Sequence, residues 1–326
     1  MAQALVAPDA FKGTFDATTV ADTLASGLEE AGWEADRCPV ADGGEGTLEL
    51  LVGALGGRLV AVTASDPLGR AIECQVGHAG DTAIVEVAQA SGLALVRAPE
   101  RDAWRASTRG TGELIIAAAA GAGEIFVAAG GSATTDGGRG AIEAINEGGG
   151  LGAARLVVLC DVEIAFEDAP RIFGPQKGAD QATVARLQER LARFAQTLPR
   201  DPRGVPATGA AGGLAGGLWA AFDAELRPGA PAVLDALGVD ARMRASQLVV
   251  AGEGCIDEQS FGGKVVGELV RRAHAAGVPI HAVAGSTTLP EAQWARVGLE
   301  RVWTASTLDE IAAAGRELGA AVGRAG

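Results

Sequence analysis

Strands that alternate with helices at both ends of the chain, but not in its middle, constrain the fold most. Apolar runs predict strands at residues 5–8, 36–41, 248–251, 279–284 and 301–304. Helical patterns follow most of these runs, and such alternation is typical of parallel sheets. Two strands at the front and three at the back are the number that one flavodoxin-like sheet needs, so we expect both chain ends to complete a single sheet.

The middle of the chain has a different pattern. Short strand patterns separated by turn residues occur here, at 58–63, 71–76 and 83–87. Short connections favour antiparallel pairing, which indicates a second domain. We therefore predict an α/β protein in which a flavodoxin-like parallel sheet domain, residues 1–60 and 245–326, is interrupted by an inserted α/β domain, residues 61–244. Because ligands of open α/β sheets bind at the carboxyl ends of strands, we expect the active site in the cleft between the domains.

Composition narrows the possible partners. A net charge of −14 repels phosphate backbones, so we expect no nucleic-acid partner. No apolar run reaches about 18 residues, and the N-terminus has neither a basic segment nor a long apolar stretch, so we expect no membrane association and no secretory signal. The four cysteines lie far apart, which argues against a zinc site. These features predict a cytoplasmic protein, monomeric or homodimeric, that acts on small molecules.

Lysine is rare and placed unusually. Of the 27 lysines and arginines only Lys12, Lys177 and Lys264 are lysines, and each is next to a glycine. An ammonium is a compact charge that fits a tight phosphate pocket lined by backbone N–H groups, whereas a guanidinium is a wide fork. Three residues are a small sample, and glycine is common in this chain, so chance is the alternative. We interpret the three lysines as residues of a phosphate-binding cleft.

Glycines also gather in loops that carry acids or hydroxyls, at residues 9–13, 41–47, 130–138, 173–178 and 252–257. Backbone amides freed by glycine hold phosphate oxygens, and carboxylates hold Mg²⁺ or accept a proton from an attacking hydroxyl. A conformational role is the alternative for the glycines, and helix N-caps are the alternative for Asp42, Asp136 and Asp257. A Walker A loop is excluded because Val265 follows Lys264. Together the loops predict phosphoryl transfer.

The same segments resemble the type I glycerate kinases over most of the chain. The resemblance rests on motifs at residues 9–13, 41–47, 66–69, 88–93, 107–113, 130–138, 173–179, 209–213 and 252–259. It implies a flavodoxin-like domain interrupted by a second α/β domain, and transfer of phosphate from ATP to D-glycerate with Mg²⁺, commonly giving 2-phosphoglycerate. Thr135 stands where the family usually has asparagine, and residues 163–166 form a shorter loop than the family's.

Site roles are hypotheses at this point. We expect the catalytic residues to be Lys12, Asp42, Asp257 and Lys264. The lysines would neutralise phosphate or carboxylate, and one of the aspartates would accept the proton of the attacking hydroxyl. The expected substrate and phosphate contacts are Gly43, Gly44, Glu45, Ser132, Thr134 and Lys177, with Mg²⁺ on Asp136 or Asp161. The alternatives are a kinase for another small hydroxy acid or polyol, and a nucleotide sensor without turnover.

Overall fold

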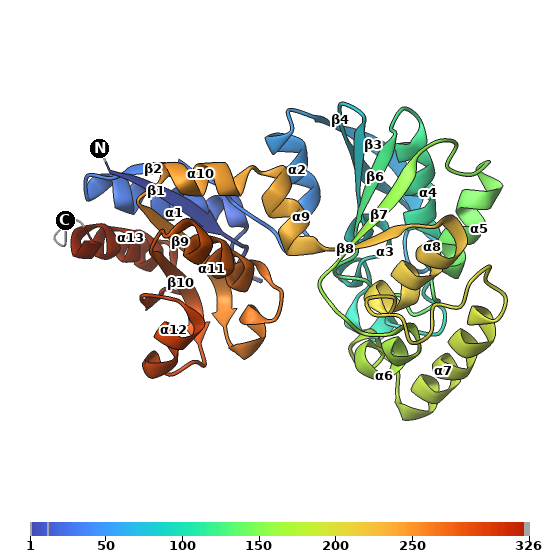
Figure 1. Ribbon diagram of the computed structural model, residues 1–326. Coiled ribbons are helices and arrows are strands. Elements are labelled where there is room, and N and C mark those ends of the chain that lie inside the picture. Colours follow the sequence, from blue (N-terminus) through green and yellow to red (C-terminus); the bar gives the residue numbers. More distant parts are fainter. Residues whose placement is uncertain (1, 12, 323–326) are drawn as a thin grey trace. The chain divides into compact units, whose positions relative to one another are not determined.

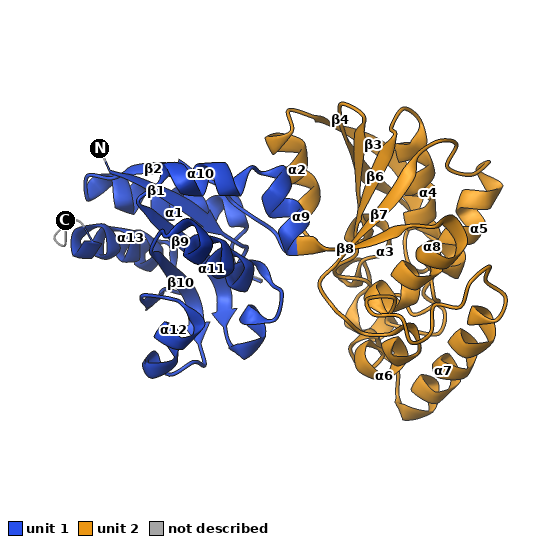
Figure 2. Ribbon diagram, viewed as in Figure 1, with its two compact units in different colours: residues 1–42, 230–326 blue, residues 43–229 orange. Residues whose placement is uncertain are grey.

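The chain folds into two compact units. The structure is a computed structural model that describes residues 2–11 and 13–322 (Figure 1). Unit 1 comprises residues 1–42 and 230–326, and unit 2 comprises residues 43–229 (Figure 2). Among the described residues, no helix is both long and apolar enough to cross a membrane.

Unit 1 is built on a parallel sheet of five strands in the order β11-β10-β9-β1-β2. Its strands are β1 (Gln3–Pro8), β2 (Glu34–Arg37), β9 (Leu248–Ile256), β10 (Ile280–Thr287) and β11 (Val302–Thr304). Read from the other edge, this is the 2-1-3-4-5 order of flavodoxin-like folds. The predicted sheet, closed by both ends of the chain, is therefore confirmed.

Alternate residues of β1 reach opposite faces of this sheet. Ala4 and Val6 belong to a core with α1 (Ala17–Glu30) and α13 (Leu308–Val322), whereas Leu5 and Ala7 belong to a core on the other face. Helices contributing to that second core are α9 (Gly229–Ala236), α10 (Val239–Ala245), α11 (Val265–Ala276) and α12 (Glu291–Val297). Helices on both faces explain why β1 is apolar and buried along nearly all of its length.

Unit 2 holds a mixed sheet of six strands in the order β3-β4-β5-β6-β7-β8. Its strands are β3 (Arg58–Ser65), β4 (Ala71–Ala79), β5 (Thr82–Glu86), β6 (Glu124–Ala128), β7 (Arg155–Cys160) and β8 (Glu225–Pro228). β3 to β5 pair antiparallel, as the turn signals predicted, and β5 to β8 pair parallel. Because parallel strands end at one edge, the loops after β5, β6 and β7 start side by side.

Unit 2, whose residues are all described, contains seven α-helices. They are α2 (Thr47–Ala54), α3 (Val87–Ser91), α4 (Arg109–Ala119), α5 (Arg139–Glu147), α6 (Ala169–Phe173), α7 (Gln181–Ala195) and α8 (Leu214–Phe222). The sequence predicted no helix at α3, α5, α6, α8, α9, α10 or α12 and no strand at β8.

The predicted boundaries, near residues 60 and 245, lie later in the chain than the divisions at 42/43 and 229/230. Helix α2 packs on the second sheet, where Gly77 of β4 leaves room for Leu48 and Val52. Helices α9 and α10 instead place Leu234 and Met243 in the core of the first sheet. Each helix belongs to the unit whose sheet buries its apolar face. The predicted boundaries were placed from strand patterns alone, so they assigned these helices to the wrong unit.

Candidate active site

Residues 130–138, the glycine-rich loop after β6, form the best organised part of the site. The ammonium of Lys177 donates to Ser132 Oγ at 2.9 Å and to the carbonyl of Thr134 at 2.7 Å. The structure thus brings together three of the predicted phosphate-binding residues. Lys177 is only 2% exposed, so its ammonium supports the loop from the protein interior and does not face solvent. Burial lowers the pKa of Lys177 to about 7, although the charge of Asp136 opposes this shift.

Asp136 ties the same loop to two helices. Its carboxylate accepts hydrogen bonds from Thr108 N and Oγ1 at 2.9 Å each, and from Gly138 N and Gly140 N at 3.1 Å each. Thr108 is the N-cap of α4, and Gly138 is the N-cap of α5. Four donors use most of the acceptor capacity of a carboxylate. This arrangement favours the capping role that the sequence left open and leaves little room for a metal ion at Asp136.

A left-handed turn braces the loop from its other side. Ala211, Gly212 and Gly213 all have positive φ angles, and the carbonyl of Gly212 accepts from Gly137 N at 3.1 Å. A Cβ atom at Gly212 would overlap the carbonyl oxygen of Thr134. Glycine is required here both by its φ of +68° and by this close approach.

The loop that precedes α2 packs on the loop after β6. A Cβ atom at Gly130 would lie 2.5 Å from the Cα of Gly44, and one at Gly43 would lie 2.7 Å from the Cα of Gly229. Glu45 is exposed on this loop, and its Oε2 lies 3.9 Å from the Cβ position of Gly131. Gly43 and Gly44 therefore permit close backbone packing, the conformational role that the sequence left open for them, and they bring Glu45 beside the loop after β6.

Glu86, at the end of β5, was missed by the sequence analysis. It is 3% exposed, and its Oε2 accepts from Gly46 N at 3.1 Å and from Leu48 N at 3.2 Å, which caps α2 across 38 to 40 residues of chain. Burial raises the pKa of Glu86 to about 7, and the negative charges of Glu45 and Glu49 add to this shift. The only signal in the sequence is an acid that ends an apolar strand.

Replacing Glu86 by glutamine is expected to stabilise the protein above pH 7 and to change little at pH 4.5. Because the folded-state pKa is raised from 4.5 to about 7, the folded protein binds more protons in this window, and stability falls as pH rises through it. Glutamine stays neutral and can still accept both N–H groups. The gain above pH 7 should be on the order of 2 kcal/mol in urea unfolding.

The exposed Glu189 provides the control for this substitution, since Glu189→Gln removes the same charge from unit 2 without a buried partner. An unchanged pH dependence of unfolding in Glu86→Gln would contradict the assignment.

In unit 1, Asp257 and Lys264 lie at helix starts. Asp257 caps the short 3-10 helix Glu258–Phe261, accepting from Gln259 N at 2.8 Å and Ser260 N at 3.2 Å, with Ser260 Oγ accepting from Asp257 N in return. The capping role that the sequence allowed for Asp257 is therefore present. Lys264 is the N-cap of α11 and is half-buried. A cation is electrostatically unfavourable at this end of a helix, unless an anion binds beside it.

For the remaining predicted site residues the structure gives a position in the fold but no contact that indicates a role. Asp42 is the last residue of the first segment of unit 1, and Asp161 directly follows β7; both are half-buried. Lys12 lies outside the described residues. Since Lys177 belongs to unit 2 and Lys264 to unit 1, the convergence of the three lysines stays a prediction, as does the cleft between the units.

Comparisons with known proteins show the family to which the chain belongs. The profile of the glycerate kinase family matches residues 4–148 and 149–319. The chain belongs to the glycerate kinase family. A glycerate kinase from Halalkalibacterium halodurans is 37% identical over 86% of this chain and 85% of its own, and a glycerate 2-kinase from Escherichia coli is 36% identical over 94% and 92%. A crystal structure from Salmonella typhimurium LT2, provisionally named glycerate kinase 2, superposes with a TM-score of 0.85 at 33% identity, covering 99% of both chains.

In this member of the glycerate kinase family, four of the motifs that carry the resemblance contact the loop after β6. Ser91 accepts from Ala133 N at 2.8 Å, and Leu93 N donates to Gly131 at 2.7 Å, so the motif at 88–93 lines the loop after β6. The motifs at 107–113, 173–179 and 209–213 reach the same loop through Asp136, Lys177 and Gly212, as described above. The loop after β6 is therefore the structural centre of the candidate site in unit 2.

Proposed function

We propose that the protein is a glycerate kinase that transfers the γ-phosphoryl group of ATP to D-glycerate, giving 2-phosphoglycerate and ADP. The similarity to glycerate kinases along almost the whole chain carries this proposal. The construction of unit 2 supports it, because four family motifs hold one glycine-rich loop in a fixed shape. Positioning and electrostatics supply most of the rate in phosphoryl transfer, so a rigid loop of backbone N–H groups suits the reaction.

The transfer needs a proton acceptor, a positive charge and hydrogen-bond donors from this chain. A hydroxyl oxygen of glycerate attacks the γ-phosphorus, the bond between the γ-phosphorus and its bridging oxygen breaks, and ADP leaves. The hydroxyl proton passes to a carboxylate, for which Asp42 and Asp257 stay the candidates. Lys264 at the start of α11 offers positive charge to a phosphate group. Ser132 and the buried hydroxyl of Thr134, which has no hydrogen-bond partner among the described residues, are the candidate donors in the loop.

Mg²⁺ would supply charge neutralisation on the phosphates. The described residues contain no group of three or more histidine, cysteine, aspartate or glutamate side chains placed to hold a metal ion. This is compatible with Mg²⁺, which is commonly bound by one or two carboxylates together with substrate phosphates. Asp136 fits poorly because its carboxylate is engaged by four donors, so we propose Asp161 as the ligand. A cytoplasmic location and a monomeric or homodimeric state stay predictions.

The proposal is tested by incubating the purified chain with ATP, Mg²⁺ and D-glycerate. We expect release of ADP, and phosphorus NMR should show the ester at C2. Faster turnover of another hydroxy acid or a polyol in a parallel panel would favour the alternative kinase. ATP binding without ADP release would favour the nucleotide sensor.

Replacing Lys264 by glutamine is expected to lower kcat/KM for ATP by about tenfold or more, since a charged hydrogen bond to phosphate is lost. The exposed Arg296 on α12 supplies the control, because Arg296→Gln removes one positive charge from the same unit. Steady-state kinetics with varied ATP measures the effect. Equal kcat/KM values for the two variants would remove Lys264 from the phosphate site.

A further inference from the structure

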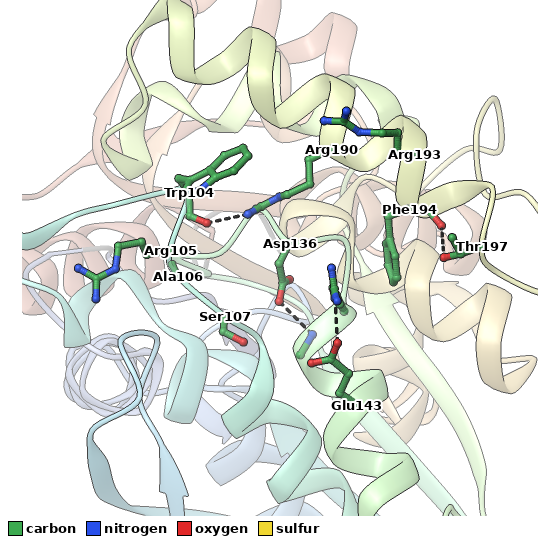
Figure 3. A pocket seen from close by; sticks show the side chains of 12 residues that line it. Trp104, Arg105, Ala106, Ser107, Asp136, Glu143, Arg190, Arg193, Phe194 and Thr197 are labelled. Carbon is green, nitrogen blue, oxygen red and sulfur yellow. Dashed lines mark hydrogen bonds and ion pairs between the residues drawn. The ribbon is translucent and has the colours of Figure 1, made fainter.

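A cavity of about 560 Å³ opens in unit 2 beside the loop after β6. Figure 3 shows its lining: the segment from Trp104 to Ser107, Asp136, the first turns of α5, and one side of α7. Among the lining residues are the arginines Arg105, Arg139, Arg190 and Arg193, against two acids, Asp136 and Glu143. An excess of positive charge in one cavity is unusual for a chain with a net charge of −14.

Arg190 is the most constrained cation of the cavity. Its Nη1 donates to the carbonyl of Trp104 at 2.6 Å and its Nη2 to the carbonyl of Thr135 at 2.7 Å, whereas its Nε is buried and has no hydrogen-bond partner among the described residues. No carboxylate of the described chain forms an ion pair with it, and burial lowers the pKa of Arg190. The guanidinium also lies over the ring of Trp104, at 4.5 Å from its centroid. Two carbonyl groups and one ring do not neutralise a partly buried cation, and a bound anion would compensate its charge.

The other arginines leave further positive charge at the rim. Arg139 pairs with Glu143 at 2.8 Å, but both side chains are largely exposed, so the pair neutralises the cavity weakly. Arg193 is 3.8 Å from its nearest acid, Glu189. Arg105 has no ion pair within the described chain, and its side chain is turned outward in Figure 3. Trp104 and Phe194 add apolar walls. The cavity therefore suits a small anion, with room for a short carbon skeleton beside the charge.

We propose that this cavity binds a small multivalent anion that carries a phosphate group, either free phosphate or a phosphate ester of a small organic acid. The inference goes beyond the proposed function, because it requires no turnover and concerns a cavity not assigned to the transfer. Arg190 holds the carbonyl of Thr135, and Asp136 lines the cavity, so occupancy would act directly on the loop after β6.

Isothermal titration of the full chain, without ATP, tests the proposal. Inorganic phosphate and 2-phosphoglycerate are the probes, and chloride at matched ionic strength is the blank. Replacing Arg139 by glutamine should weaken phosphate binding by about tenfold, because one charge-assisted contact is lost. Arg155→Gln is the matched control: Arg155 is also an exposed arginine of unit 2 paired with a glutamate at 2.8 Å, but it does not line the cavity.

The titrations distinguish an ester ligand, free phosphate and the absence of an anion site. Tighter binding of 2-phosphoglycerate than of phosphate, lost in Arg139→Gln and kept in Arg155→Gln, supports the proposal and assigns an ester. Equal binding of the two probes with the same pattern of loss supports it and assigns free phosphate. No binding of either probe above chloride overturns it, as does equal binding by both variants and the wild type. Arg190→Gln, checked for folding by circular dichroism, should show a loss at least as large as Arg139→Gln.

Discussion

Replacing Lys177 by methionine is expected to lower kcat for ATP-dependent phosphorylation of glycerate by about a hundredfold, with a smaller change in KM. Methionine fills a similar volume but cannot donate to Ser132 Oγ and the carbonyl of Thr134, so residues 130–138 lose their anchor. Lys177 is buried, so we assign it a positioning role. Arginine should also fail, because a guanidinium is wider than the space an ammonium occupies.

A second measurement separates loss of this anchor from general damage. Because burial lowers the pKa of Lys177 from 10.5 to about 7, the unfolded chain binds more protons between these values, and stability rises as pH increases through this window. Lys177→Met removes this contribution, so its unfolding free energy should rise less between pH 7 and 10.5 than that of the wild type. Wild-type kcat in Lys177→Met would show that the anchored loop is not needed for transfer.

Periodic apolar patterns predicted most of the framework. Strands such as β1 and β4 were predicted from the sequence because burial on a sheet leaves a recognisable apolar pattern. Helix α8 was missed because its first turn lies in the glycine-rich and proline-rich stretch 199–217, which is typical of a loop. It forms because its small residues pack closely: Gly216 and Gly217 lie against Phe166 and the backbone of Gly137.

The candidate site was predicted as a set of residue types, and not as a set of contacts. The position of Lys177 beside a glycine identified it as special, but its partners lie 43 and 45 residues away, a pairing that no local pattern contains. The sequence also could not distinguish a ligand from a cap at Asp136 and Asp257, because both roles use the same residue type before a helix. Burial and hydrogen bonding decide such cases, and both are properties of tertiary structure.

Replacing Gly212 by alanine is expected to lower the free energy of unfolding by about 3 kcal/mol or more. Two costs add at this position. The φ angle of +68° is unfavourable for alanine, and the new Cβ atom would overlap the carbonyl oxygen of Thr134. That oxygen accepts a hydrogen bond from Lys177, so moving it also disturbs the anchor of the loop, and kcat should fall together with stability.

Gly204 separates these two costs. It lies in the same unit with a φ of +71°, but a Cβ atom there would meet nothing within 4 Å. Gly204→Ala should therefore cost only about 1 kcal/mol, the price of a left-handed alanine alone. The difference between the two variants in urea unfolding isolates the contact with Thr134. If both variants lose the same stability and keep full activity, the left-handed turn at 211–213 does not brace the loop after β6.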